Sequence, residues 1–290
     1  MLAGLNDSRF PGLIRLEAGV AAPEDLMPVH EQIYVQKALG LRTEAGKLIM
    51  LDADTVFSCG TLKAALRGAG GAIDAVDVVM SGQASSAFVA TRPPGHHAEP
   101  SRAMGFCLFN NVAIAAHHAR ARWGLKRIAV ADFDVHHGNG TQAAFWDDPD
   151  LFFVSSHQHP CYPGTGFAEE RGSADNIVNA PLAPGTGSVE FRSAWSNILI
   201  PALDVFAPEL LIVSAGFDAH RDDPLAQLQL GPEDFSWVTK ELVGVALRHC
   251  RGQIVSVLEG GYDLPALAES AAAHVSELQT GDPSGVAGPL

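Results

Sequence analysis

Arg127-Ile-Ala-Val-Ala-Asp-Phe-Asp-Val-His-His137 joins a short apolar segment directly to two carboxylates and two imidazoles. Side chains alternate faces along an extended chain, so Asp132, Asp134 and His136 can share one face while the apolar residues between them pack behind. Such a cluster is costly to bury unless a cation neutralises it, and a divalent metal with mixed oxygen and nitrogen ligands meets that need. We therefore expect a buried strand that ends at a metal site; the alternative is a set of surface polar residues in a loop.

A second segment, Thr91-Arg-Pro-Pro-Gly-His-His-Ala98, also follows a short apolar run and presents adjacent histidines. Neighbouring imidazoles with different partners can hold different pKa values near neutrality, as a proton-transfer step and its electrostatic partner require. His96 and His97 are therefore candidate catalytic residues. The alternative is a structural pair that backbone carbonyls satisfy.

Apolar, β-branched runs alternate with longer helical patterns from residue 60 onward. Strands are expected at 87–91, 127–131, 151–155, 209–214 and 253–258. Helices are expected at 61–67, 73–80, 110–123, 189–206 and 232–249. Continuous apolar strands separated by helices predict an α/β fold with a mostly parallel sheet covered on both faces.

Polar residues come just after each of these expected strands. They are His96 and His97, the segment 132–137, His157, Asp218 and the segment 259–262. Ligands of open parallel sheets bind at the carboxyl ends of the strands, so these segments are expected to converge on one rim.

Asp218 follows a buried strand in Ser214-Ala-Gly-Phe-Asp218. With Asp134 and His136 it gives three ligands and leaves a coordination position open, as a catalytic metal site requires. Asp222 and Asp223 are alternatives, although they lie in a turn before a proline, where acids are common. Tyr262, on a glycine hinge after the last strand, could donate a hydrogen bond to a developing oxyanion or could simply anchor its loop.

The chain of 290 residues contains no Pro/Gly/Ser-rich linker, so one domain over 1–290 is expected, with 1–50 as a loop-rich flank. No apolar run approaches the length of a membrane span, and the N-terminus lacks a signal pattern, which predicts a cytoplasmic protein. Four widely spaced cysteines, without a Cys-x-x-Cys pair, are expected to stay reduced.

The formal net charge is −14, from 33 acidic against 19 basic residues. Such a balance argues against nucleic acid and anionic membranes as partners, because both repel an acidic surface. A cationic substrate would be attracted.

Several motifs together resemble a known family. They are Arg92-Pro-Pro-Gly-His-His-Ala98, Gly105-Phe-Cys-Leu-Phe-Asn-Asn111, Asp132-Phe-Asp-Val-His-His-Gly138, Tyr162-Pro-Gly-Thr-Gly166, Ala215-Gly-Phe-Asp218 and Glu259-Gly-Gly-Tyr-Asp263. In this order, over roughly residues 50–270, they resemble the zinc-dependent histone deacetylase family, on its class II and bacterial histone deacetylase-like amidohydrolase side. The resemblance implies an arginase-deacetylase type fold and hydrolysis of an acyl amide on an amine.

The resemblance also implies residue roles. Asp134, His136 and Asp218 would hold Zn²⁺, with Fe²⁺ as the alternative. His97 would be the general base, Tyr262 the oxyanion donor, and His96 with Asp132 an orienting pair. Asn139 stands where some relatives carry an aspartate, so the pKa of His97 should be lower than beside an anion.

Further positions are implied on the substrate and cation sides. Gly105, Phe106 and Tyr162 would line a narrow channel, joined by Gly260, and Leu225 matches a rim position that is a glutamate in a polyamine-selective relative. A leucine there favours acyl-lysine or a neutral acyl amide over an acylpolyamine. K⁺ is expected at a monovalent site made by Asp132, Asp134, His136, Ser155 and Ser156.

The sequence departs from the family at its start, because the usual additional strand and histidine-proline-glutamate segment are not recognisable before residue 51. An incomplete sheet edge would expose unpaired backbone unless a loop or a second copy covers it, which raises homo-oligomerisation as an expectation.

Three alternatives remain beside the deacetylase interpretation. An acetylpolyamine amidohydrolase is favoured by the acidic composition but not by Leu225. A binuclear arginase-like enzyme would need further bridging carboxylates. A non-catalytic acyl-amine binding protein would be indicated by loss of Tyr262, a tandem histidine or a ligand, and none is lost.

Overall fold

The expected strands pair side by side in one six-stranded sheet, in the order β3-β8-β7-β4-β5-β6, and every pairing is parallel. The structure is a computed structural model and describes residues 1–5 and 9–280. The strands are β3 (Ser86–Val89), β4 (Ile128–Asp132), β5 (Leu151–Gln158), β6 (Ile177–Leu182), β7 (Leu210–Ala215) and β8 (Ile254–Leu258). The α/β fold class with a parallel sheet is confirmed.

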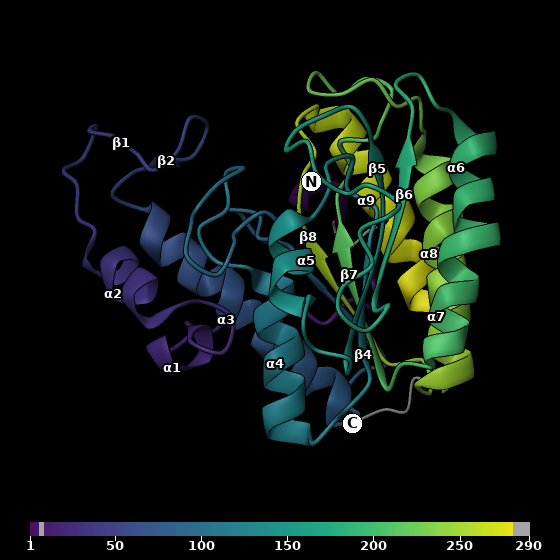
Figure 1. Ribbon diagram of the computed structural model, residues 1–290, viewed down its shortest axis with the longest axis horizontal. Helices are drawn as coiled ribbons and strands as arrows, with labels where there is room; N and C mark the ends of the chain where they lie inside the picture. The colour runs from purple at the N-terminus through teal and green to yellow at the C-terminus, as the bar shows by residue number, and fades with distance from the viewer. Residues whose placement is uncertain (6–8, 281–290) are drawn as a thin grey trace.

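Helices cover both faces of this sheet (Figure 1). They are α1 (Pro23–Leu26), α2 (Gln32–Gly40), α3 (Thr61–Met80), α4 (Asn111–Trp123), α5 (Asn139–Phe145), α6 (Ser188–Ala194), α7 (Ile200–Phe206), α8 (Pro232–His249) and α9 (Leu264–Thr280). Two short helices are η1 (Leu2–Leu5) and η2 (Trp195–Leu199), and a small antiparallel hairpin joins β1 (Ile49–Met50) to β2 (Val56–Phe57).

The central strand β4 shows how alternation builds two cores. Ala129 and Ala131 face a cluster that contains apolar side chains of α6, α7, α8 and α9. Ile128 and Val130 face the opposite cluster, formed with α1, α2, α3, α4 and α5. Because every β4 residue is buried on one face or the other, its sequence is a continuous apolar run that ends at Asp132.

Local signals explain several helix ends. Asn110 caps α4 by accepting from the N–H of Ala113, and Gly124 ends the helix in the left-handed conformation with φ 70°. Pro232 occupies the first turn of α8, where Asp234 accepts from the N–H of Gly231. These helices match the expected 110–123 and 232–249.

Other expectations need correction. The patterns at 61–67 and 73–80 belong to the single helix α3. The expected helix 189–206 is divided into α6, the π-helical turn η2 and α7. Pro201 explains the division, since it has no N–H to donate within a continuous helix.

Several elements were not assigned from the sequence. The strand β6 contains Pro181 and Asn179 and lies at the sheet edge, where a proline does not interrupt a ladder on both sides. Within the expected loop-rich flank 1–50, α1 and α2 are helical, and Pro23 begins α1. Together with the β1–β2 hairpin they lie on the outer side of α3 (Figure 1).

The strand β3 is the other edge of the sheet, and among the described residues only β8 pairs with it. Leu5 and Phe10 pack against Ala272 and Val275 of α9, with Phe88 of β3 beside them. Within residues 1–5 and 9–280 no further strand pairs with this edge, and N-terminal side chains cover apolar surface next to it. Over residues 1–5 and 9–280 no helix combines the length and apolar character needed to cross a bilayer.

Candidate active site

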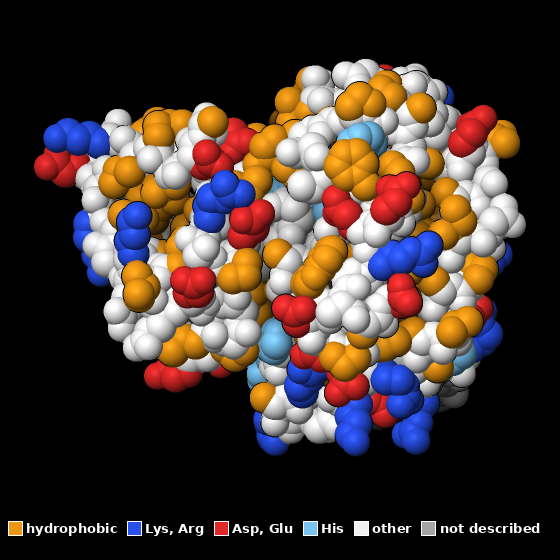
Figure 2. All heavy atoms as spheres, viewed as in Figure 1, with side chains coloured by type: hydrophobic (Ala, Val, Ile, Leu, Met, Phe, Trp, Pro, Cys, Tyr) orange, Lys and Arg blue, Asp and Glu red, His pale blue; other side chains and the backbone are white. Residues whose placement is uncertain are grey.

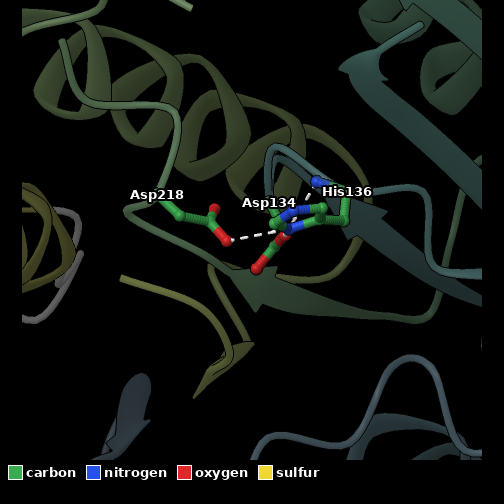
Figure 3. A group of neighbouring side chains, drawn as sticks. All are labelled: Asp134, His136 and Asp218. Atoms are coloured by element: carbon green, nitrogen blue, oxygen red, sulfur yellow. Dashed lines mark hydrogen bonds and ion pairs between the residues drawn. The ribbon is translucent and has the colours of Figure 1, made fainter. Parts of the chain in front are cut away.

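The end of β4 and the loops after β4 and β7 bring three predicted metal ligands together. Asp134, His136 and Asp218 are buried, and one ligand atom from each lies within 4.8 Å of the others. His136 Nδ1 lies 3.2 Å from Asp134 Oδ1 and 3.1 Å from Asp218 Oδ2. Figure 3 shows the three side chains pointing toward one another. In the part of the chain that the structure describes, this is the one such group of His, Cys, Asp or Glu side chains.

The surroundings of this cluster fit a divalent cation. Burial and the charge of Asp134 raise the pKa of Asp218, so ionising Asp218 beside Asp134 carries a cost that a cation between them would remove. A Cβ on Gly216 or Gly260 would overlap the Asp134 carboxylate, which explains the two glycines beside the cluster. The N–H of Gly260 donates to Asp134 Oδ2 (2.8 Å) and orients that carboxylate. Two oxygens and one nitrogen are ligands that Zn²⁺ accepts.

The adjacent histidines have different partners. His96 Nδ1 lies 3.0 Å from Asp132 Oδ2, whereas His97 Nδ1 lies 2.8 Å from Asn139 Oδ1. Burial disfavours a charged His96, but the charges of Asp134 and Asp132 outweigh it and raise its pKa to about 10. Burial, together with the charges of His96 and His136, lowers the pKa of His97 well below its usual value. One imidazole is thus held charged and the other neutral.

Tyr262 lies on the loop after β8, and its N–H donates to Asp223 Oδ2 (2.8 Å). Its ring meets Phe106 edge to face at 5.8 Å, and the Arg92 guanidinium lies 5.3 Å from the ring centre. Burial and the charges of Asp218 and Asp134 raise the pKa of Tyr262. The phenol therefore keeps its proton and can donate a hydrogen bond beside the cluster.

The predicted channel residues lie near this group. Tyr162 meets the His97 ring edge to face at 5.1 Å, and both Tyr162 and Phe106 are partly exposed. The N–H of Gly105 donates to Asp54 Oδ1 (3.1 Å), and a Cβ there would overlap the His97 ring. Leu225 is 44% exposed, and Gly260 packs against the carboxylates of Asp218 and Asp134. The substrate role of all five residues stays a prediction.

The alternative acids lie outside the cluster. Asp223 accepts from the N–H groups of Tyr262 and Leu225, and Asp222 is exposed. Of the three acids after β7, the structure therefore brings Asp218 alone to Asp134 and His136.

Two residues of the predicted K⁺ site lie on β5 and are buried. Ser155 pairs with Asp132 in the sheet register, and its Oγ lies 2.9 Å from His157 Nδ1. Ser156 Oγ accepts from Trp195 Nε1 (3.0 Å). The K⁺ site of Asp132, Asp134, His136, Ser155 and Ser156 stays a prediction.

His157 does not follow its strand as expected. The strand β5 continues to Gln158, so His157 lies within it, buried between Ser155 and the carbonyl of Gly166. Burial lowers its pKa to about 4. Its hydrogen bond to the Gly166 carbonyl ties β5 to the loop 159–166, which carries Tyr162.

Sequence reasoning missed the contacts of two glutamates, the buried Glu259 and the half-buried Glu99. Glu259 Oε2 accepts from the N–H groups of Gly95 (2.6 Å) and His96 (3.1 Å), and so fixes the tandem-histidine loop. Burial raises the pKa of Glu259 to about 7. An acid directly after the apolar run of β8 was the available signal. Glu99 contacts Asn139, and its place in sequence gave no such signal.

A family profile and several known proteins match this chain. The profile of the histone deacetylase domain matches residues 3–278. The histone deacetylase-like amidohydrolase of Pseudomonas aeruginosa is 41% identical over 275 residues, covering 93% of this chain and 71% of that protein. A probable deacetylase of Archaeoglobus fulgidus is 40% identical over 259 residues, covering 87% and 70%.

A plant protein and a solved structure are also similar. Histone deacetylase 14, chloroplastic, of Arabidopsis thaliana is 41% identical over 264 residues, covering 87% of this chain and 62% of that protein. The crystal structure of the HDA15 HD domain superposes with a TM-score of 0.88 at 34% identity, covering 96% of this chain and 79% of that one.

Proposed function

Because the chain belongs to the histone deacetylase family, we propose that it hydrolyses an acyl amide on an amine, with Zn²⁺ held by Asp134, His136 and Asp218. The observation that carries the proposal is the buried convergence of these three ligands beside two imidazoles with different partners. When bound, Zn²⁺ supplies a Lewis acid for a carbonyl oxygen and lowers the pKa of water. Fe²⁺ is the alternative metal, and K⁺ would occupy the predicted monovalent site.

His97 is proposed as the general base. With its Nδ1 engaged by Asn139, the Nε2 atom can take a proton from the attacking water as oxygen joins the acyl carbon. The same proton then passes to the amine nitrogen as the C–N bond breaks. Since the pKa of His97 is lowered, the imidazole is neutral and ready to accept at neutral pH.

His96 and Asp132 act as a charged pair next to this base. The Asp132 carboxylate holds the His96 ring by a hydrogen bond, and the ring centres of His96 and His97 are 4.0 Å apart. A protonated His96 disfavours a second positive charge on His97, which helps His97 to release its proton to the leaving amine.

Tyr262 would donate a hydrogen bond to the substrate carbonyl oxygen as negative charge develops there. The exposed rings of Phe106 and Tyr162, near Tyr262 and His97, would flank the methylenes of an amine chain. Leu225 offers no ion pair to a distal ammonium, so we propose acyl-lysine as the preferred class. We also propose that the protein acts in the cytoplasm.

The metal assignment is tested with Asp218→Asn and the control Asp222→Asn, which changes an exposed acid outside the cluster. Zinc content and hydrolysis of an acetyl-lysine peptide are measured for both, with chelator-treated protein alongside. We expect Asp218→Asn and chelation to remove zinc and activity, and Asp222→Asn to keep both. Full zinc occupancy and turnover in Asp218→Asn would contradict the proposal.

The substrate class is tested by comparing kcat/KM for acetyl-lysine peptides with that for acetylspermidine. Faster hydrolysis of acetylspermidine would favour the acetylpolyamine amidohydrolase alternative. Binding of acyl amines without any turnover of the zinc-loaded protein would favour a non-catalytic binding protein.

A further inference from the structure

The Asn139 side chain lies between the predicted general base and a carboxylate that the motifs did not single out. Asn139 Oδ1 is 2.8 Å from His97 Nδ1, and Asn139 Nδ2 donates to Glu99 Oε1 (2.8 Å). Gly140 and Thr141, the next residues of α5, donate their N–H groups to the carbonyl of His96. The backbone therefore fixes the place of Asn139 beside the histidine pair.

The chemistry of the neighbours decides which way the Asn139 amide points. An ionised carboxylate only accepts hydrogen bonds, so Glu99 must face the NH₂ group. The other neighbours of that nitrogen are also acceptors: the His97 carbonyl oxygen at 3.5 Å and Met104 Sδ at 3.4 Å. The amide oxygen consequently faces His97, and the hydrogen bond forms only if Nδ1 carries the proton.

This orientation matters because a neutral imidazole has one N–H. With the proton on Nδ1, the Nε2 lone pair is free to accept a proton. With the amide reversed, NH₂ would face Nδ1, the ring proton would move to Nε2, and His97 could not act as a base. An asparagine amide has no orientation preference of its own, so its neighbours must fix it.

We propose that Glu99 is a positioning residue that fixes the Asn139 amide and thereby keeps His97 in the tautomer that can act as a base. The proposal rests on the proposed function of the site, since the tautomer matters only if His97 accepts a proton. Glu99 acts through Asn139 and need not touch the substrate.

The backbone of Glu99 is well placed for this role. Its N–H donates to the carbonyl of Arg102 (3.0 Å), and its carbonyl lies 3.0 Å from Nδ1 of the buried His30. The Glu99 side chain also pairs with the exposed Arg102 at 3.0 Å, through Oε2. The two carboxylate oxygens thus have separate partners, which lets the ion pair be removed without removing the Asn139 contact.

The first test uses steady-state kinetics of the zinc-loaded protein on an acetyl-lysine peptide. Glu99→Ala and Glu99→Met both remove the acceptor. The alanine also removes the aliphatic part of the side chain, whereas the methionine keeps it. We expect kcat to fall about tenfold in both variants, with little change in KM. This loss is smaller than the hundredfold or more that a general base contributes, because His97 itself is still present. Glu99→Gln keeps an acceptor oxygen and Arg102→Ala keeps the carboxylate, so both should stay near the parent value.

Equal losses in Glu99→Gln and Glu99→Met, or a loss in Arg102→Ala as large as in Glu99→Met, would overturn the proposal. The Glu99→Met variant retains the packing of the stem, so a result is available even if Glu99→Ala folds poorly.

The second test repeats Glu99→Met in an Asn139→Asp background. An aspartate can accept from His97 Nδ1 in either orientation, so Glu99 is no longer needed and would repel the new carboxylate. We expect Glu99→Met to leave kcat unchanged or to raise it in that background. The same loss in both backgrounds would show that Glu99 does not act through the Asn139 amide.

The third test does not depend on activity. Long-range ¹H–¹⁵N spectra of ¹⁵N-histidine-labelled protein, assigned by comparison with His97→Ala, report which ring nitrogen carries the proton. We expect a proton on Nδ1 of His97 in the parent and in Glu99→Gln, and a mixture of tautomers in Glu99→Met. An unchanged His97 signature in Glu99→Met would refute the inference, and absence of deacylase activity would refute only the proposed function.

Discussion

His96 and His97 are neighbours of the same residue type, but their pKa values shift in opposite directions and their hydrogen-bond partners differ. A carboxylate from β4 stabilises the charged form of His96, whereas an amide oxygen from α5 offers His97 a hydrogen bond without a full charge. Burial acts on both rings in the same direction. The difference in protonation therefore comes from the charges around each ring, since Asp134 and Asp132 favour a charged His96 while His96 and His136 disfavour a charge on His97.

Tyr262→Phe tests the proposed oxyanion donor. The change removes one hydroxyl and keeps the ring against Phe106, so zinc should remain bound while turnover falls by about a hundredfold or more, as for loss of such a donor. Zinc content and kcat on an acetyl-lysine peptide are the measurements. Unchanged kcat would remove Tyr262 from the mechanism.

A buried histidine outside the site should affect the stability of the fold at low pH. His274 lies between Thr239 Oγ1 (2.6 Å) and Ser256 Oγ (2.8 Å), and burial lowers its pKa to about 3. The unfolded chain binds a proton near pH 6.5, well above the folded pKa. The neutral, buried His274 therefore contributes its full stability above pH 6.5, and this contribution is lost as the pH falls from 6.5 toward 3.

His274→Asn should remove this pH dependence. Between pH 7.5 and 5.5 the parent should lose about 1.4 kcal/mol more unfolding free energy than the variant, the value of one pH unit for one proton. Urea unfolding at the two pH values gives the difference. Equal losses in parent and variant would show that His274 is not held neutral.

At the scale of the elements, α8 is anchored by Phe235. The ring is fully buried and packs against Phe217 at 5.2 Å and Phe133 at 6.0 Å, near the loops that carry Asp218 and Asp134. Phe235→Ala should lower the unfolding free energy by about 3–5 kcal/mol. Val205→Ala, which changes an 88% exposed side chain on α7, should stay within about 0.5 kcal/mol. Similar unfolding midpoints for the two variants would contradict this assignment of the core.

Strands and helices with a complete local signal could be predicted from sequence. The strand β4 reads as an apolar run, and α4 has both a capping asparagine and a terminal glycine. The strand β6 could not be found in this way, because its pairing with β5 outweighs the poor strand propensity of Asn179 and Pro181.

The same reasoning explains which site residues could be found. The ligand set came from short motifs at strand ends, where local sequence and position in the sheet agree. Glu259 and Glu99 act on residues that lie 164 and 40 positions away, and only tertiary structure brings those pairs together. Local pattern could place Glu259 at the rim but did not reveal its partners, and it gave no signal for Glu99.

At the scale of the whole molecule, charge is distributed unevenly. Figure 2 shows acidic side chains between the α1–α2 region and the sheet body, while many Lys and Arg side chains lie at the lower end of this face. The net charge of −14 favours approach of a cationic amine carrier over nucleic acid, which stays a prediction. One domain over 1–290 is likewise proposed, and its last ten residues lie outside the described part.

Because β3 is an edge strand, the N-terminal residues that pack beside it should affect whether copies of the chain associate. Phe10 is 3% exposed and packs with Leu5 against α9, next to Phe88 of the edge strand. Phe10→Asp should release this segment and expose the apolar surface of α9 and Phe88, next to the β3 edge, to other copies. We expect the weight-average mass to rise with concentration more steeply than for the parent, measured by light scattering after size exclusion. Leu2→Asp, at a 66% exposed position, is the matched control and should behave as the parent. Identical mass profiles for Phe10→Asp and Leu2→Asp would mean that the N-terminal segment does not protect the edge.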